Sequence, residues 1–259
     1  MGGLNLWSQQ ARLIQSATAY GAAALITVTL HEFAHGFTAV LLGLAPTVYG
    51  LHEEDVANTG APAALIAAAG PVVSLILGLL FLALHKRMRG QGFGRYLAMW
   101  LGLLGIAVFT GYLMTAPFYK QGDVYKVLSS LGLVSPIALA ASLVLGGIGI
   151  VLLARMGLPC LLSLTNSEAP LRPQMMASGL LAWVGGSLLV LLAMAPQVPW
   201  MLVAIGTFVP LINLFASRRD KTQSWGEPGA EPRFSLAGIG LLVALAVLEQ
   251  TVLRRGVTL

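Results

Sequence analysis

The chain has 259 residues, of which 57% are apolar and only 10% are charged, and its mean hydropathy is +0.82. Soluble globular domains carry about a quarter charged residues, so this composition excludes that class. The formal net charge of +5 does not indicate a nucleic-acid-binding protein, because most basic residues form short clusters between apolar runs. The single cysteine, Cys160, excludes an internal disulfide and a zinc site built from cysteines. We therefore expect an integral membrane protein.

Seven apolar stretches follow one another along the chain, each near the roughly 20 residues that a helix needs to cross the bilayer. They predict an all-α fold, a single integral membrane domain over residues 1–259 with six to seven transmembrane helices. In chain order the stretches cover residues 13–44, 61–84, 96–118, 136–154, 175–195, 198–216 and 235–253.

Basic residues are distributed unevenly between the loops, which bears on the orientation in the membrane. Placing the N-terminus in the cytoplasm puts most Lys and Arg inside and leaves Lys120, Lys126, Arg254 and Arg255 outside. Cytoplasmic loops are enriched in Lys and Arg, so this count predicts an inside N-terminus and an outside C-terminus.

Residues 27–43 read TVTLHEFAHGFTAVLLG and place three titratable side chains within one apolar helix. His31 and His35 are four residues apart, so both imidazoles can converge on one ion. Glu32 projects about 100° around the helix from His31, from where it could act on a metal-bound water without being a ligand. An ionisable residue within a bilayer costs on the order of 3 kcal/mol, and a divalent cation would offset this cost. Alternatively, both histidines hydrogen-bond neighbouring helices and Glu32 is protonated.

A hydrolytic zinc site has three protein ligands and one open position, so a third ligand is needed. Asp123 is favoured because the segment PFYKQGDVYKVL follows an apolar stretch directly, and its Pro117 and Gly122 predict an interrupted helix there. Such a break would let a carboxylate reach an ion that another helix binds. The alternative is that Asp123 caps a helix at the membrane surface. The other candidates, which we interpret as interfacial residues, are His52, His85 and Glu249.

Three segments occur in an order that resembles the site-2 protease family of intramembrane zinc metalloproteases. They are HEFAH at 31–35, AAAGPVVSLILG at 67–78 and TAPFYKQGD at 115–123, and the resemblance covers about residues 20–130. It implies that His31, His35 and Asp123 bind Zn²⁺ and that Glu32 is the general base. Residues 13–130 would then form the catalytic core, and the helices of residues 136–253 would be accessory.

The third segment departs from the family pattern, which has an asparagine followed by Leu-Asp-Gly. Thr115 stands about where the asparagine would be, Gly122 replaces the leucine, and Val124 replaces the glycine. The chain therefore resembles a divergent member. Members of this family usually have their active site near the cytoplasmic side of the membrane. The charge distribution instead places the C-terminal end of the motif helix and Asp123 toward the outside.

The expected function is zinc-dependent hydrolysis of a peptide bond in a membrane-anchored protein. The expected location is the lipid bilayer of a bacterial or archaeal cell, and no nucleic-acid partner is expected. Two other classes are open. One is a membrane protein that binds or transports a divalent metal, and the other is a catalytically inactive family member that binds membrane clients. The sequence leaves the oligomeric state open.

Overall fold

The computed structural model describes residues 6–50, 53–54, 59–120, 122–166, 171–195, 206, 208–217 and 235–259, and most of them are helical. Six helices in these ranges are long and apolar enough to cross a membrane, as expected of a multi-pass membrane protein. They are α1 (Leu6–Leu41), α2 (Gly60–Arg87), α3 (Phe93–Tyr119), α5 (Pro136–Leu162), the run α6 (Leu171–Met175), η1 (Met176–Leu180) and α7 (Leu181–Met194), and α10 (Leu236–Thr251).

These helices match six of the seven predicted stretches. The seventh prediction, residues 198–216, lies partly outside the described residues, and its described part includes the ten-residue helix α9 (Phe208–Ser217). The first helix begins earlier than predicted, at Leu6. It includes residues 6–12, which precede the apolar stretch. The short helix α4 (Asp123–Ser130) follows α3.

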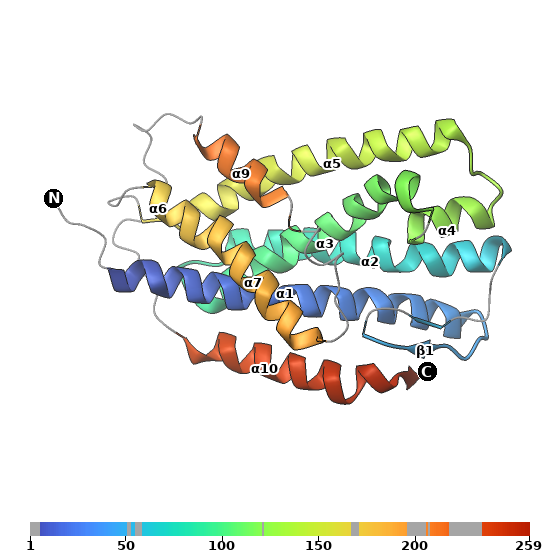
Figure 1. Cartoon of the computed structure of the whole chain (residues 1–259), viewed down its shortest axis with the longest axis horizontal. Helices are drawn as coiled ribbons and strands as arrows, with labels where there is room; N and C mark the ends of the chain where they lie inside the picture. Colours follow the sequence, from blue (N-terminus) through green and yellow to red (C-terminus); the bar gives the residue numbers. More distant parts are fainter. Residues whose placement is uncertain are drawn as a thin grey trace.

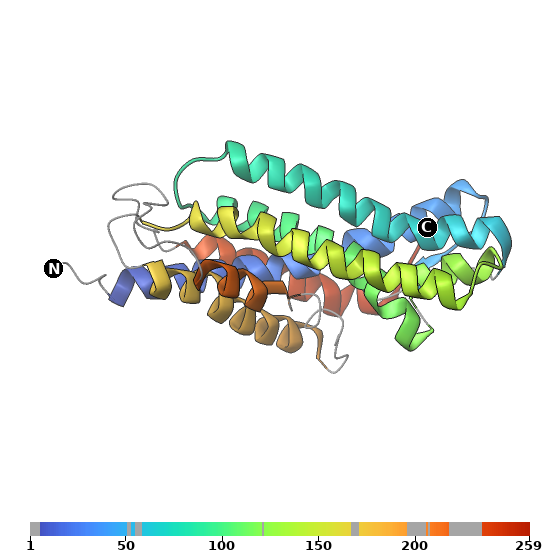
Figure 2. The same ribbon diagram turned by 90° about the horizontal axis from the view of Figure 1, so that it is seen from above.

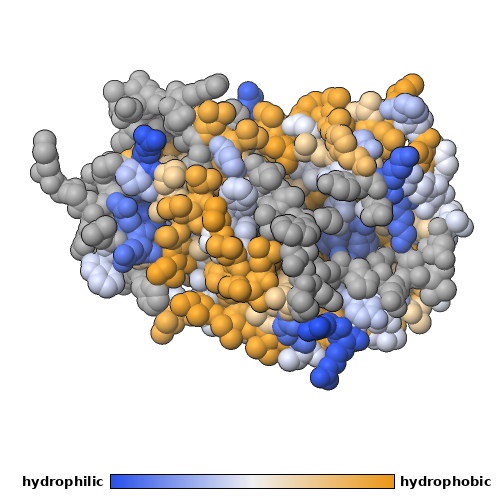
Figure 3. All heavy atoms as spheres, in the orientation of Figure 1, coloured by the Kyte–Doolittle hydropathy of each residue, from blue (hydrophilic) through white to orange (hydrophobic). Residues whose placement is uncertain are grey.

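Figures 1 and 2 show an elongated bundle in which α1, α2, α3 and α5 run along the long axis. The C-terminal end of α1, the start of α2 and helix α4 gather at one end, and the described N-terminus lies at the other (Figure 1). On the face drawn in Figure 3, apolar side chains cover much of the middle, and the most hydrophilic residues lie mainly toward the two ends. This distribution suits a bilayer around the middle of the bundle.

Helix α1 lies at the centre and packs against α2, α3, α7 and α10. Its middle section carries small buried residues, which let neighbouring helices approach closely. Tyr20 of α1 and Trp100 of α3 are both fully buried, with ring centroids 5.1 Å apart in an edge-to-face arrangement. The Trp100 indole N–H also donates to the Ser16 hydroxyl at 2.9 Å. The central helix is thereby fixed against α3.

Helices α2 and α3 approach each other through glycines. A Cβ on Gly105 would lie 2.5 Å from the carbonyl oxygen of Ser74 and 2.9 Å from the Cα of Gly78. Only glycine fits such a backbone contact, so the two helices are held at a fixed spacing. This spacing sets where the α2 residues around Ser74 lie relative to α1.

A small sheet adds to the helices, and the sequence patterns did not indicate it. Strand β1 (Thr47–Val48) pairs antiparallel with β2 (Glu53–Glu54) and with β3 (Val257–Thr258), in the order β2-β1-β3. Two-residue strands are too short to show a period in the sequence. The prediction of an all-α chain therefore needs correction at this point. A single 3-10 turn, η2 (Leu253–Arg255), joins α10 to β3.

The orientation of the bundle can be measured through Thr59, which is exposed just before α2. The charge distribution predicts that Thr59→Cys reacts with a membrane-impermeant maleimide added outside intact cells. Cys160, the only natural cysteine, is buried, so the parent protein supplies the background. Arg89→Cys, exposed beyond the other end of α2, is the matched control and should react only after lysis. The opposite labelling pattern would favour the orientation that the family resemblance implies.

Candidate metal centre

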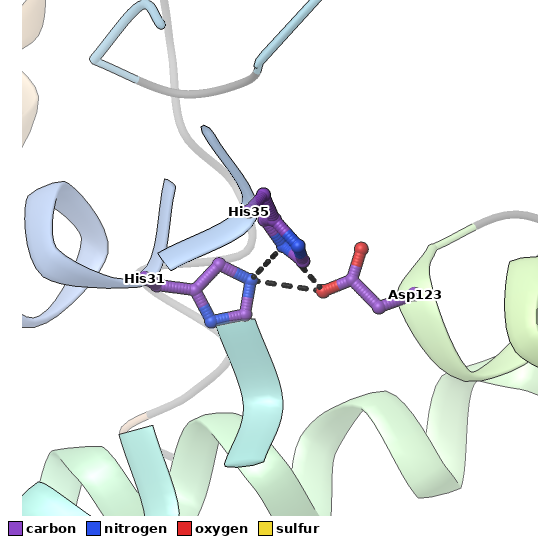
Figure 4. Close-up of side chains that lie close together, drawn as sticks. All are labelled: His31, His35 and Asp123. Carbon is purple, nitrogen blue, oxygen red and sulfur yellow. Dashed lines mark hydrogen bonds and ion pairs between the residues drawn. The ribbon is translucent and has the colours of Figure 1, made fainter. Parts of the chain in front are cut away.

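Three side chains from two distant segments converge at the α4 end of the bundle. The His31 Nε2 lies 2.9 Å from the Asp123 Oδ2 and 3.1 Å from the His35 Nε2, and the His35 Nε2 lies 3.4 Å from the same carboxylate oxygen. Figure 4 shows the two imidazoles of α1 and the carboxylate of α4 pointing toward one another. Within the described chain, these three residues are the group that could hold a metal ion.

The spacing of the three atoms fits a tetrahedral zinc site. Zinc binds His nitrogen and carboxylate oxygen at about 2.0–2.2 Å, which places tetrahedral ligand atoms roughly 3.3 Å from one another. The three separations of 2.9, 3.1 and 3.4 Å are close to that edge length. The donor set of two histidines and one carboxylate also suits Zn²⁺ and leaves a fourth position for water.

The hydrogen bonds around the histidines fix which ring nitrogen faces the cluster. The His35 Nδ1 donates to the carbonyl oxygen of Ile66 at 2.6 Å, because a carbonyl can only accept. The Nε2 of neutral His35 then carries a lone pair directed at the cluster. The His31 Nδ1 lies 3.1 Å from the Ser74 hydroxyl. Such outer partners orient metal-binding imidazoles and hold them in the required tautomer.

Gly70 makes room for the cluster on the α2 side. A Cβ at this position would lie 2.3 Å from the His35 Nε2 and 2.7 Å from the His31 Nε2. Its φ is not in the left-handed region, so the reason for glycine here is space, not backbone conformation. The AAAGPVVSLILG segment therefore contributes a gap against which the Nε2 atoms of both histidines lie.

The turn between α3 and α4 brings Asp123 to the histidines. Lys120 (φ +48°) and Gly122 (φ +82°) both have left-handed backbone, which ends α3 and redirects the chain at α4. A Cβ on Gly122 would lie 3.1 Å from the Tyr112 ring. That ring in turn stacks on His31 at a centroid distance of 5.3 Å and an angle of 9°. Tyr112 thus packs between the turn and the imidazole plane. Pro117 lies inside α3, two residues before its end.

The site lies below the end of α1 rather than at its tip. His31 and His35 precede Leu41 by ten and six residues, or about 15 and 9 Å along the axis. Apolar side chains beyond the histidines are exposed, with Phe37 at 57% and Leu41 at 85%. Before the histidines, Leu30 is 40% exposed. Exposed apolar residues on both sides of a polar cluster are expected where the surrounding solvent is lipid.

Asp123 forms the accessible side of the cluster. Its side chain is 17% exposed, whereas both imidazoles are 3% exposed, so the cluster is open on the α4 side. Burial raises the pKa of Asp123, but when the His31 and His35 Nε2 atoms carry protons in place of a metal ion, their hydrogen bonds and charges outweigh burial and hold that pKa well below the usual range. The carboxylate is therefore ionised, as a cation ligand must be.

No family model, curated protein or solved structure matches this chain. What the cluster does must therefore be inferred from its own residues. Four residues that surround the cluster had no role predicted from the sequence: Ile66, Gly70, Ser74 and Tyr112. Gly70 lies in a segment that resembles the site-2 protease pattern, and that resemblance was the signal that could have found it.

The other acidic and histidine candidates lie elsewhere or are not described. His85 was expected at the interface, but it is buried and bonded to the Arg95 carbonyl and the Ser163 hydroxyl. Glu249, expected at the end of the last helix, is also buried, and it accepts a hydrogen bond from Thr29. His52 lies outside the described residues.

Glu32 and Thr115 are the remaining residues of the predicted site. Glu32 is buried next to His31 and is not a member of the cluster of His31, His35 and Asp123. The hydroxyl of Thr115 donates to the carbonyl oxygens of Gly111 and Tyr112 at 3.0 and 3.4 Å, within its own helix.

Proposed function

We propose that this chain is an intramembrane zinc metalloprotease that resembles the site-2 protease family and hydrolyses a peptide bond of a membrane-anchored protein. The convergence of His31, His35 and Asp123 at zinc-ligand spacing is the observation that supports this function most strongly. Glu32 is buried and follows His31 directly in the sequence, and it supplies the general base that such a reaction also requires.

In this proposal the ligands are His31, His35 and Asp123. Zinc held there would lower the pKa of a bound water and polarise a carbonyl, which is the chemistry that the protein side chains lack. Glu32 accepts the proton of the attacking water and passes it to the nitrogen of the departing amine, so the peptide C–N bond is replaced by a carboxylate and an amine. Ile66 and Ser74 keep the imidazoles oriented, and Gly70 keeps the space clear.

The depth of the cluster defines the substrate class. A helical peptide bond is already hydrogen-bonded within its helix, so the substrate segment must be unwound to reach the cluster. The opening of the cluster on the Asp123 side limits cleavage to the membrane half that contains α4. We therefore propose a membrane-anchored protein whose spanning helix is weak near that membrane surface.

Metal analysis and cleavage of a reporter test this function together. The purified protein is expected to contain about one zinc per chain, and His31→Ala and Asp123→Ala are each expected to lose most of it. His85→Ala is the matched control, because His85 is also a buried histidine but lies in the last turn of α2, where it bonds to Ser163. A reporter with a glycine-weakened spanning helix should be cleaved in liposomes, and chelation should stop cleavage until zinc is restored.

Three results would contradict the proposal in different ways. Equal zinc in the parent protein and in the His31→Ala and Asp123→Ala variants would remove the metal centre. Zinc binding without cleavage of any weakened-helix reporter would instead favour the inactive family member. Flux of the metal across the liposome membrane would favour a transporter, for which Glu32 would be dispensable.

A further inference from the structure

Glu249 is a buried carboxylate that the proposed mechanism does not use. It lies on α10 in an otherwise apolar segment, LAGIGLLVALAVLEQT, and only 5% of it is exposed. Keeping an ionisable residue in a spanning helix is costly, and such residues usually have a defined partner and role. Its partner among the described residues is on the helix that carries His31 and His35.

The contact with Thr29 crosses between helices. The Thr29 hydroxyl donates to the Glu249 Oε1 at 2.8 Å. Threonine in a helix commonly donates to a carbonyl of its own preceding turn instead. Among the residues that the structure describes, other helical threonines do so, namely Thr18, Thr38, Thr110, Thr115 and Thr251. Thr29 instead donates to a side chain of another helix, and this bond links α1 to α10.

The second oxygen of Glu249 lies against the loop that follows β1. A Cβ on Gly50 would lie 2.0 Å from the Glu249 Oε2, so this carboxylate occupies the space of the missing side chain. Gly50 does not have a left-handed φ, and the fit to the carboxylate explains why glycine is needed there. One side chain thus contacts both α1 and the loop that continues from it.

The Thr29 contact lies on the face of α1 that includes Glu32. Thr29, Glu32 and Gly36 are spaced i, i+3 and i+7, so they share one side of the helix. At Gly36 that side meets the sheet, since a Cβ there would lie 2.4 Å from Val48 of β1 and 2.9 Å from Leu259, which follows β3. Glu32 therefore lies between the Glu249 contact and the sheet contact.

We propose that Glu249 is a positioning residue: through Thr29 and Gly50 it holds the Glu32 face of α1 and the loop after β1 in the arrangement that cleavage requires. This inference rests on the proposed function. In this proposal α10, which is predicted from the sequence to be an accessory helix, belongs to the catalytic unit. Figure 1 shows α10 running beside α1, with its C-terminal end next to β1.

The test compares two cross-helix contacts of α10. Glu249→Leu and Thr29→Val each remove the bond to α1, and they are expected to lower kcat about tenfold, with KM and zinc content close to the parent values. Glu249→Gln keeps an oxygen that can accept from Thr29 and is expected to restore kcat. Gln250→Ala is the matched control, because Gln250 bonds α10 to the backbone of Ala193 and Ala195 at the end of α7. It should leave kcat unchanged.

A measurement without substrate separates this inference from the proposed function. Hydrogen–deuterium exchange of residues 44–50 should be faster in Glu249→Leu than in the parent protein, and unchanged in Gln250→Ala. Equal losses of kcat in the Glu249→Leu and Gln250→Ala variants would overturn the positioning role, because both would then reflect general docking of α10. Unchanged exchange and unchanged kcat in Glu249→Leu and Thr29→Val would overturn it as well. Absence of cleavage by the parent protein would refute the protease, while the exchange result would still decide whether Glu249 holds the loop.

Discussion

Glu32→Gln is expected to lower the cleavage rate by about a thousandfold while the protein still binds zinc. Glutamine has nearly the same shape as glutamate but cannot accept the proton of the attacking water. Glu32 does not belong to the cluster of His31, His35 and Asp123, so the metal ligands are untouched. The variant should therefore separate metal binding from catalysis.

The rate is measured with the liposome reporter under single-turnover conditions, with zinc content determined on the same preparation. Glu249→Gln is the matched control, because it makes the same chemical change at another buried glutamate of the bundle and should retain activity. Cleavage by Glu32→Gln at the parental rate would rule out the proton-transfer role. Loss of zinc from this variant would show instead that Glu32 contributes to binding.

Gly70→Ala is expected to weaken zinc binding at least about a hundredfold. The added methyl would lie 2.3 Å from the His35 Nε2 and 2.7 Å from the His31 Nε2. Neither imidazole can retreat without losing its bond to Ile66 or Ser74. Both nitrogens would turn away from Asp123, and the cluster would no longer converge. Zinc affinity can be measured by competition with a chromogenic chelator.

Two other glycines show whether the effect of Gly70→Ala is specific. Gly147→Ala adds a methyl to α5 where nothing lies within 4 Å, and it should change neither folding nor zinc affinity. Gly78→Ala adds one where α2 meets α3, 2.8 Å from the Ile106 nitrogen, and should lower stability while the folded fraction still binds zinc. If Gly70→Ala bound zinc as tightly as Gly147→Ala, the gap at Gly70 would have no role in the metal centre.

The membrane-spanning helices and the cluster of His31, His35 and Asp123 could be anticipated because their signals are local or chemically simple. Length and hydropathy alone identify a spanning helix, and six such helices are present in the described residues. The spacing of His31 and His35 places them on one helix face wherever the helix lies. The turn-forming residues Pro117 and Gly122 predict that Asp123 can reach the histidines, and Asp123 does lie beside both of them. The roles of these residues and of Glu32 stay predictions.

The surroundings of the cluster could not be read from the sequence. The Ile66 group that bonds His35 is a backbone carbonyl, which every residue has, so no residue type indicates it. Ser74 and Tyr112 are ordinary residues of membrane helices until α2 and α3 are packed against α1. Their contacts depend on how the helices pack, and the packing of α2 on α3 depends on backbone contacts at glycines.

The contacts of the last helix with α1 and β1 could not be predicted for a related reason. Glu249 near a helix end resembles any side chain that reaches toward the membrane surface. Its burial follows from the partner Thr29, which is 220 residues away in the sequence. The pairing of β3 with β1 brings the same two regions together, and strands of two residues leave no pattern to detect.

The proposed ligands lie on two segments, with Asp123 92 residues after His31. A cation that binds all three favours only the arrangement in which α4 is docked against α1, so occupancy and docking form one thermodynamic equilibrium. By mass action, free zinc at a hundred times the dissociation constant would add about 2.7 kcal/mol to the stability of that arrangement. The same ion would then stabilise the packing of the helical bundle. Removal of the metal would lower the stability of the protein as well as abolish the proposed activity.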